Sequence, residues 1–110
     1  MSKYTNITSA TNTDLISSAD FSVNSLNKFA TTTANVNKIM VANTSASTAT
    51  ITLAVYQLAS PNTTYFLIEN LDIPPEVTFV WDEEFSFNVS THKLRITNSG
   101  SSPGLTVITN

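Results

Sequence analysis

The sequence predicts an all-β fold: a single jelly-roll-like antiparallel β-sandwich of about seven to eight strands, with an extended amino-terminal arm. Two observations predict it. Apolar and polar residues alternate in stretches such as Ala49 to Val55, and this period of two places the apolar residues on one face of a sheet. Thr, Ser and Asn make up 44 of the 110 residues, so the opposite faces carry hydroxyls and amides more than charges. Such surfaces suit packing against other proteins.

Composition limits the possible partners. A chain of 110 residues matches one domain with one modest core. Five basic residues and a net charge of -3 argue against a nucleic-acid partner, because phosphate binding needs clustered Lys and Arg. There is no cysteine, so thiolate chemistry and Cys-based metal sites are excluded. No apolar run approaches the roughly 20 residues of a spanning helix, so we expect no membrane partner.

The pattern changes near Ala34. Residues 1–35 are mostly Ser, Thr and Asn with scattered apolar side chains, and we interpret them as an arm or peripheral strands; residues 36–110 form the predicted sandwich domain. Within the arm, Leu15 to Phe29 shows near-helical spacing, although Phe21 and Val23 alternate as in a strand. We favour extended structure there, because Ser, Thr and Asn side chains compete with helical hydrogen bonds. A helix is the alternative.

Seven strands are predicted in the sandwich domain, each rich in β-branched or aromatic residues and bounded by turn residues. In order, they are Val36–Asn43, Ala49–Leu58, Thr64–Ile73, Val77–Trp81, Phe85–Val89, Lys93–Asn98 and Leu105–Thr109. Polar links separate the first three strands, and Pro74-Pro75 ends the third because proline cannot donate to a ladder. Both glycines lie in the last loop, Ser99 to Gly104.

The alternation also assigns side chains to faces. The predicted core consists of Ile51, Leu53, Val55, Tyr65, Leu67, Leu71, Ile73, Val77, Phe79, Trp81, Phe85, Phe87, Val89, Leu94, Ile96, Leu105 and Val107. Four large apolar residues remain on the opposite faces: Phe66, Ile68, Val80 and Ile108. They predict a second buried surface, formed by the arm or by a neighbouring subunit.

Several segments resemble small virion structural proteins of tailed bacteriophages. These are Lys38 to Leu53, Thr64 to Ile68, Ile73-Pro74-Pro75, Leu94 to Ile96, and Leu105 to Ile108. In that family a strand ending in N-x-S-x-S leads into a Thr-rich strand, then an aromatic strand, then an Ile-Pro turn. The similarity covers residues 36–110 and rests on the order of elements; Pro75 stands where the family more often has Ala.

The resemblance implies a non-enzymatic structural protein located in the virion. The leading expectation is a capsid decoration or cement protein that binds the major capsid protein or other virion proteins as a homo-oligomer. A neck, tail or fibre accessory of the virion is the alternative. The residues expected to contact partners are Leu15, Ile16, Phe21, Phe29, Phe66 and Ile68.

Two polar motifs invite a chemical role. Asp82-Glu83-Glu84 could hold Ca²⁺ or act as an acid and base, but the spacing of a calcium loop is absent, so we interpret it as a solvated acidic turn. The acidic residues from 69 to 84 could also face a basic patch on a partner. His92, the single histidine, lies in a polar turn, and no catalytic motif accompanies it. We therefore expect no enzymatic activity and no cofactor.

A carbohydrate-binding or receptor-binding module is the second alternative. Tyr4, Tyr56, Tyr65 and Trp81 could form an aromatic platform on which sugars stack. We favour a core position for Tyr65 and Trp81, because Trp81 continues the register of Val77 and Phe79.

Overall fold

The computed structural model describes residues 2–9, 12–17, 33–99 and 104–110. The strands in these segments are β1 (Lys3–Ile7), β2 (Asn12–Ile16), β3 (Thr33–Val36), β4 (Ile39–Asn43), β5 (Ala49–Gln57), β6 (Thr64–Ile73), β7 (Thr78–Trp81), β8 (Phe85–Asn88), β9 (His92–Ser99) and β10 (Leu105–Thr109). Within the described segments there is no helix with the length and hydrophobicity needed to span a bilayer.

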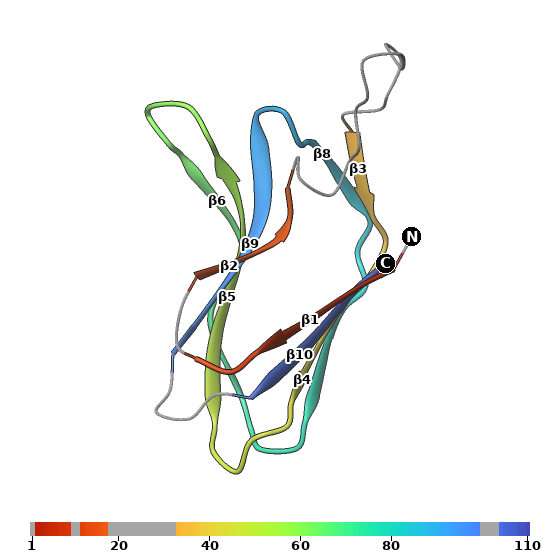
Figure 1. The fold of residues 1–110 in the computed structure, drawn as a ribbon, viewed down its shortest axis with the longest axis vertical. Coiled ribbons are helices and arrows are strands. Elements are labelled where there is room, and N and C mark those ends of the chain that lie inside the picture. Colours follow the sequence, from red (N-terminus) through yellow and green to blue (C-terminus); the bar gives the residue numbers. More distant parts are fainter. Residues whose placement is uncertain (1, 10–11, 18–32, 100–103) are drawn as a thin grey trace.

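The chain folds back on itself as one long antiparallel ribbon. β1 pairs with β10, and the pairing continues inward as β2 with β9, β3 with β8, β4 with β7, and β5 with β6. The ribbon turns back between β5 and β6, while β1 and β10 lie side by side at its other end (Figure 1). Every strand therefore pairs with the strand that mirrors it in chain order.

The ribbon is also rolled, because two further antiparallel pairs form, β10 with β4 and β9 with β5. The first sheet has the order β1-β10-β4-β7, the second sheet has the order β2-β9-β5-β6, and β3-β8 is a two-stranded sheet. A doubled ribbon rolled into two four-stranded sheets is a jelly roll. The predicted fold class is confirmed, with ten strands in the described segments where seven to eight were expected for the chain.

One predicted strand is divided. Val36–Asn43 was expected as a single element, but it forms the end of β3 and all of β4. Between them, the N–H groups of Asn37 and Lys38 donate to the carbonyl of Asn110 at 2.7 and 3.1 Å, and the N–H of Asn110 donates to Lys38 at 2.9 Å. Lys38 and Asn110 thus extend the β10–β4 ladder by one pair beyond Thr109 and Ile39. β3 and β8 continue the β4–β7 pairing beyond this point.

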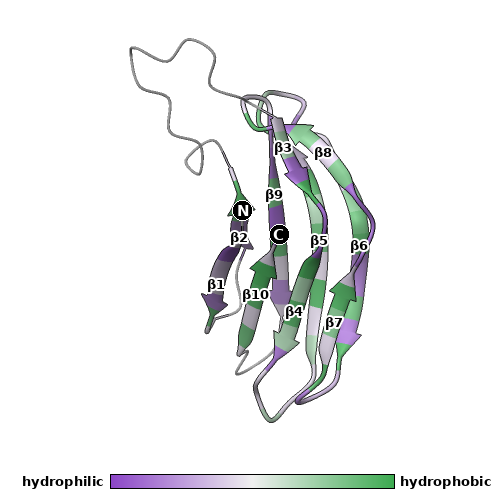
Figure 2. Cartoon of the chain, turned by 90° about the vertical axis from the view of Figure 1, so that its right-hand side faces the viewer, coloured by the Kyte–Doolittle hydropathy of each residue, from purple (hydrophilic) through white to green (hydrophobic). Residues whose placement is uncertain are grey.

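The hydrophobic core lies between the two sheets, which alternate between hydrophobic and hydrophilic residues along their strands (Figure 2). Nine of the predicted core residues are buried in it: Ile51, Leu53, Ile73, Phe87, Val89, Leu94, Ile96, Leu105 and Val107. Six more are half-buried against it: Val55, Leu67, Leu71, Phe79, Trp81 and Phe85. The structure adds Ile7, Leu15, Ala34, Val36, Ile39, Val41 and Ala49.

The core prediction is wrong for two residues: Tyr65 and Val77 are 53% and 43% exposed. β6 pairs with β5 through two bulges, one on each side of Leu53, and Asn70 near one of them has a φ of 55°. A bulge adds a residue to one strand and interrupts the alternation of faces. In addition, the end of the β5–β6 hairpin projects beyond the first sheet (Figure 1), and Tyr65 is the second residue of β6, next to this hairpin end. Val77 precedes β7 and lies in the turn.

The described part of residues 1–35 contributes edge strands. β1 and β2 lie at the edges of the first and second sheets, and Ile7 and Leu15 are buried in the core. The interpretation of Leu15 to Phe29 as extended is confirmed for Leu15 and Ile16 in β2, and residues 18–32 lie outside the described residues. The division of the chain at residue 35 stays a prediction.

A buried asparagine joins the two sheets where their turns meet. Asn43, the last residue of β4, is 1% exposed. Its Nδ2 donates to the carbonyls of Ser47, Ile73 and Pro74 at 2.8, 2.9 and 3.3 Å. Its Oδ1 accepts hydrogen bonds from the N–H and the hydroxyl of Ser45 at 3.0 and 2.7 Å. Because Ile73 ends β6, one side chain connects the first sheet, the second sheet and the β4–β5 turn.

Replacement of this side chain tests its role. We expect Asn43→Ala to lower the free energy of unfolding by about 2–4 kcal/mol, because several buried partners lose their hydrogen bonds at once. Urea denaturation measures the difference. Asn6→Ala is the matched control: Asn6 is exposed and accepts one hydrogen bond from Thr106, so its loss should cost less than about 0.5 kcal/mol. Equal losses in the two variants would contradict the proposed role of Asn43.

Candidate interaction surface

A row of side chains crosses the outer face of the second sheet. Asp14 of β2 lies opposite Arg95 of β9, Arg95 lies opposite Ala54 of β5, and Ala54 lies opposite Phe66 of β6. Directly opposed residues on antiparallel strands share one face. The preceding residue on β5, Leu53, is fully buried, so this row faces away from the core. We call these four residues the Phe66 row.

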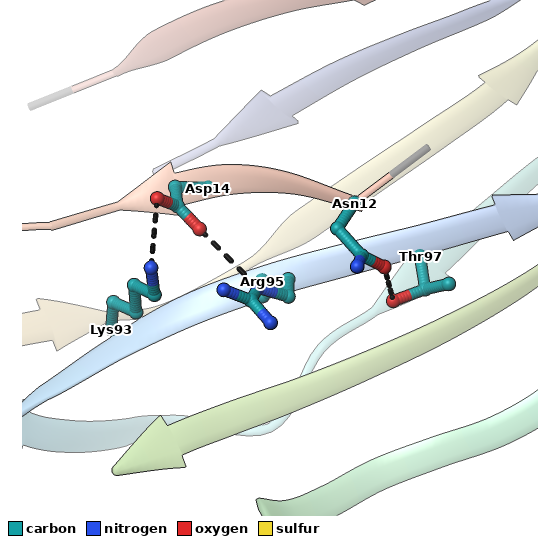
Figure 3. A network of polar contacts seen from close by, with 5 residues as sticks. All are labelled: Asn12, Asp14, Lys93, Arg95 and Thr97. Carbon is teal, nitrogen blue, oxygen red and sulfur yellow. Dashed lines mark hydrogen bonds and ion pairs between the residues drawn. The ribbon is translucent and has the colours of Figure 1, made fainter. Parts of the chain in front are cut away.

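Charged groups at one end of the row pair with each other (Figure 3). Asp14 accepts from Lys93 Nζ at 3.1 Å and from Arg95 Nε at 3.4 Å. Beside them, the hydroxyl of Thr97 donates to Asn12 Oδ1 at 2.7 Å. These contacts join β2 to β9 through side chains, in addition to their backbone ladder.

Tyr56 of β5 completes this cluster. The guanidinium of Arg95 lies 4.3 Å from the centroid of the Tyr56 ring, and Lys93 Nζ lies 5.6 Å from it. A cation over an aromatic ring contributes about 0.5–1 kcal/mol at an exposed site. Arg95 is therefore held by a carboxylate and by a ring, which fixes a planar donor group at the surface before any partner arrives.

Phe66 is the apolar end of the row. Its side chain is 54% exposed, and its cross-strand neighbour is the small Ala54. Tyr65, one residue earlier on β6, is 53% exposed but lies opposite Val55, which packs against the core. Two equally exposed aromatic residues thus belong to opposite faces of β6. On the outer face, this exposed aromatic lies two strands from Arg95, and aromatic residues and Arg are enriched at the centres of protein interfaces.

The predicted contact residues on β2 lie outside the Phe66 row. Leu15 is fully buried, and Ile16 is half-buried against the core. Leu15 therefore offers no surface to a partner in this fold, because the period of two turns it toward the opposite sheet. Phe21 and Phe29 lie outside the described residues.

The two predicted contact residues on β6 differ in their exposure to solvent. Phe66 is exposed on the outer face, whereas Ile68 is half-buried and lies opposite the core residue Leu53 beside a bulge. The bulge separates Ile68 from the Phe66 row, so only Phe66 remains in the candidate surface.

Sequence reasoning did not identify Lys93 and Arg95 as site residues, and it named Tyr56 only as part of a possible platform for sugars. A signal existed, because Lys93 and Arg95 alternate with the core residues Leu94 and Ile96 and must point outward. The pairing of Tyr56 with Lys93 has no local signal, since it depends on β5 and β9 becoming neighbours.

The acidic turn is solvated. Asp82, Glu83 and Glu84 are all exposed, and Trp81 Nε1 donates to the carbonyl of Glu83 at 3.0 Å. In the described parts of the chain, no three carboxylate or imidazole side chains gather as a metal site would require. Glu84 borders an open pocket of about 380 Å³ together with Asn35, Val36, Asn37, Phe85 and Ser86.

His92 forms local contacts. Its Nδ1 lies 2.7 Å from the hydroxyl of Thr91, and its ring lies 6.0 Å from that of Tyr65 at an angle of 51°. This hydrogen bond joins neighbours in the chain, whereas a catalytic triad orients its histidine through a carboxylate. The contacts match those of a histidine at a strand end.

The aromatic residues that could bind a sugar do not share one platform. Tyr4 is exposed on the first sheet, and Tyr56 lies on the outer face of the second sheet beneath Arg95. Tyr65 belongs to the opposite face of the second sheet, and Trp81 is half-buried against the core. The four rings therefore belong to separate surfaces.

Comparisons with known proteins give no family. No protein-family profile and no curated protein matches the chain. One similar solved structure is a chain in the structure of infectious bursal disease virus, Gx strain, with 12% identity and a TM-score of 0.48 over 100% of this chain and 32% of that one. A chain from the Gt strain has 11% identity and a TM-score of 0.42 over 99% and 26%.

This chain thus spans no more than 32% of either viral chain. Both TM-scores lie below 0.5, so we draw neither a family nor a function from them. The resemblance to tailed-phage proteins stays a prediction.

The ion pairs of Asp14 have a measurable signature. We expect Asp14→Asn to lower the free energy of unfolding by about 0.2–1 kcal/mol at low salt, and by less at high salt, because both pairs are at the surface and are screened. Thermal denaturation at two NaCl concentrations measures this. In the control Asp72→Asn, the native carboxylate accepts a hydrogen bond from the uncharged Thr50 hydroxyl at 2.6 Å, so the effect should change little with salt. The same salt dependence in both variants would be evidence against the ion pairs.

Proposed function

We propose that this chain is a non-enzymatic virion structural protein, most specifically a capsid decoration or cement protein that binds the major capsid protein or another virion protein. The jelly-roll path supports the class, because this architecture is used by viral capsid domains and by lectins. A fold hosts many functions, so the surfaces must distinguish between these two classes.

The arrangement of aromatic residues favours the virion role over sugar binding. A lectin-like site would need several of the exposed rings on one surface, and the four candidates are distributed over separate ones. The composition also favours the virion role. A surface of Thr, Ser and Asn can be buried against protein with hydrogen bonds, without the larger cost of burying unpaired charges.

The Phe66 row is the observation that carries the proposal. It presents an exposed aromatic side chain at one end and an ordered guanidinium in its middle. Full burial of Phe66 by a partner would contribute about 1.5–3 kcal/mol, and the remaining N–H groups of Arg95 can meet carbonyl or carboxylate oxygens across the interface. One such contact is weak, but a decoration protein repeats it over a whole shell, where many weak contacts reinforce one another.

A pair of neighbouring substitutions tests this surface. We expect Phe66→Ala to weaken binding to purified particles at least tenfold, because the apolar anchor is lost, and to leave the fold intact because Phe66 is exposed. Tyr65→Ala is the matched control, since Tyr65 is equally exposed on the opposite face of the same strand, and its binding should stay within about twofold. Co-sedimentation with particles measures both. Equal binding by the two variants would remove the Phe66 row from the interface.

Copy number separates the decoration role from its alternative. We expect quantitative mass spectrometry of purified virions to find this chain on the order of hundreds of times per particle, as for a part that follows the shell lattice. A small copy number matching a portal or tail symmetry would instead identify a neck, tail or fibre accessory. Absence from purified virions would refute the virion role itself.

A further inference from the structure

β6 is the longest edge strand of the two four-stranded sheets. The edge strands are β1 and β7 in the first sheet and β2 and β6 in the second. β6 has 10 residues, whereas the other three have four or five. Among the described segments, only β5 pairs with β6. The other side of β6 therefore presents backbone groups that a further strand can bind.

The pairing with β5 determines which backbone groups of β6 point away from it. Gln57 N–H donates to the carbonyl of Thr63 at 2.9 Å, so these two residues form a hydrogen-bonded pair. Hydrogen-bonded and non-hydrogen-bonded pairs alternate along an antiparallel ladder. Thr64 and Phe66 therefore belong to non-hydrogen-bonded pairs with β5. Their N–H and C=O groups point to the free edge of β6.

The other neighbour of β5 supports this assignment. Leu58 N–H donates to the carbonyl of Thr91 at 2.9 Å. The same alternation makes Ala54 and Arg95 a hydrogen-bonded pair between β5 and β9. Ala54 thus directs its backbone groups to β9, and not to Phe66 opposite it on β6.

The first part of β6 lacks the features that protect sheet edges. Natural edge strands carry charges, prolines or bulges that prevent pairing with another chain. In β6 these features come after Phe66, where the ladder is bulged and where Glu69 and Asp72 are charged. The hairpin from Gln57 to Ile68 contains no residue that is charged at neutral pH. Its end projects beyond the first sheet, which leaves this edge accessible (Figure 1).

We infer that the partner contributes an extended segment that pairs with β6 at Thr64 and Phe66 and adds a fifth strand to the second sheet. The inference rests on the proposed function, because the partner is the virion protein that binds the Phe66 row. That row ends at β6, so one partner can cover the row and continue the ladder. An extended backbone is the ligand that matches such an edge, and its main-chain hydrogen bonds supply affinity.

The side chains of β6 determine the chemistry of the added segment. Directly opposed residues share a face, so one residue of the segment packs beside Phe66 on the outer face. Phe66 is 54% exposed and the hairpin is uncharged, so an apolar residue suits this position, whereas a charged one would lose hydration without gaining a partner. Tyr65 leans away from the edge, because its ring lies 6.0 Å from that of His92 on β9.

A single backbone donor tests the added strand. We expect Thr64→Pro to weaken co-sedimentation with purified particles by about tenfold, because proline removes an N–H that points to the free edge and not to β5. Thr64→Val is the matched control: it keeps the N–H and a β-branched side chain, so its binding should stay within about twofold. Circular dichroism measures whether both variants are folded.

Amide hydrogen exchange of the unaltered chain gives a second measurement. The N–H groups of Thr64 and Phe66 should exchange rapidly in the free protein and at least about tenfold more slowly on particles, because the added strand accepts from them. Asp14 is the control on the opposite edge of the sheet. It lies opposite Arg95, which is hydrogen-bonded to β5, so the Asp14 N–H points to the free edge of β2 and its exchange should not change.

The outcomes separate this inference from the proposed function. Binding that is lost in Phe66→Ala but kept in Thr64→Pro, without protection of either β6 amide, would overturn the added strand and leave the proposed function in place. Failure of the unaltered chain to bind particles would overturn both. Protection of the two amides in concentrated protein without particles would assign the edge to a second copy, and would also overturn the inference. If Thr64→Pro does not fold, the exchange measurement decides.

Discussion

Pairing between the two ends of the chain is the constraint on which the rest of this structure depends. β10 pairs with β1 on one side and with β4 on the other, so the most C-terminal strand lies in the interior of the first sheet. Asn6 and Thr106, which share a side-chain hydrogen bond, are 100 positions apart in the chain. Such pairs join distant parts of the chain, and folds dominated by long-range pairs are slow to form because closing a long loop costs entropy early. The order of strands in the first sheet depends on this pairing.

The two sheets of the rolled ribbon must also be held in a fixed position relative to each other at their turns. Asn43 forms this connection. An amide can donate and accept at the same time, and here it does so toward three carbonyls and Ser45. An apolar residue could fill the same space but would leave those groups without partners. A fully satisfied buried polar group of this kind favours one arrangement of turns over others, since a shifted register would break several hydrogen bonds together.

The two outer faces have different chemistry although one core supports both. The second sheet presents the Phe66 row, with an ion-paired arginine stacked on a tyrosine. The first sheet presents the apolar side chains of Tyr4, Ile108, Met40 and Val80, with the exposed Lys38 and Asp82 at positions two residues from Met40 and Val80.

The sequence by itself determined the all-β class, the limits of β6 and β10, and the inward direction of residues such as Leu94 and Ile96, because a period of two is a local property of extended chain. It also indicated that Phe66, Val80 and Ile108 are not core residues. Only the tertiary structure decided which strands are neighbours, and therefore that Arg95 lies beside Tyr56 and that Val80 continues a line begun by Tyr4. Local pattern also could not show the bulges of β6 or the division of the predicted strand Val36–Asn43 into β3 and β4. The physical reason is that strand pairing and register follow from the free energy of whole sheets, in which each pair competes with every other possible pair.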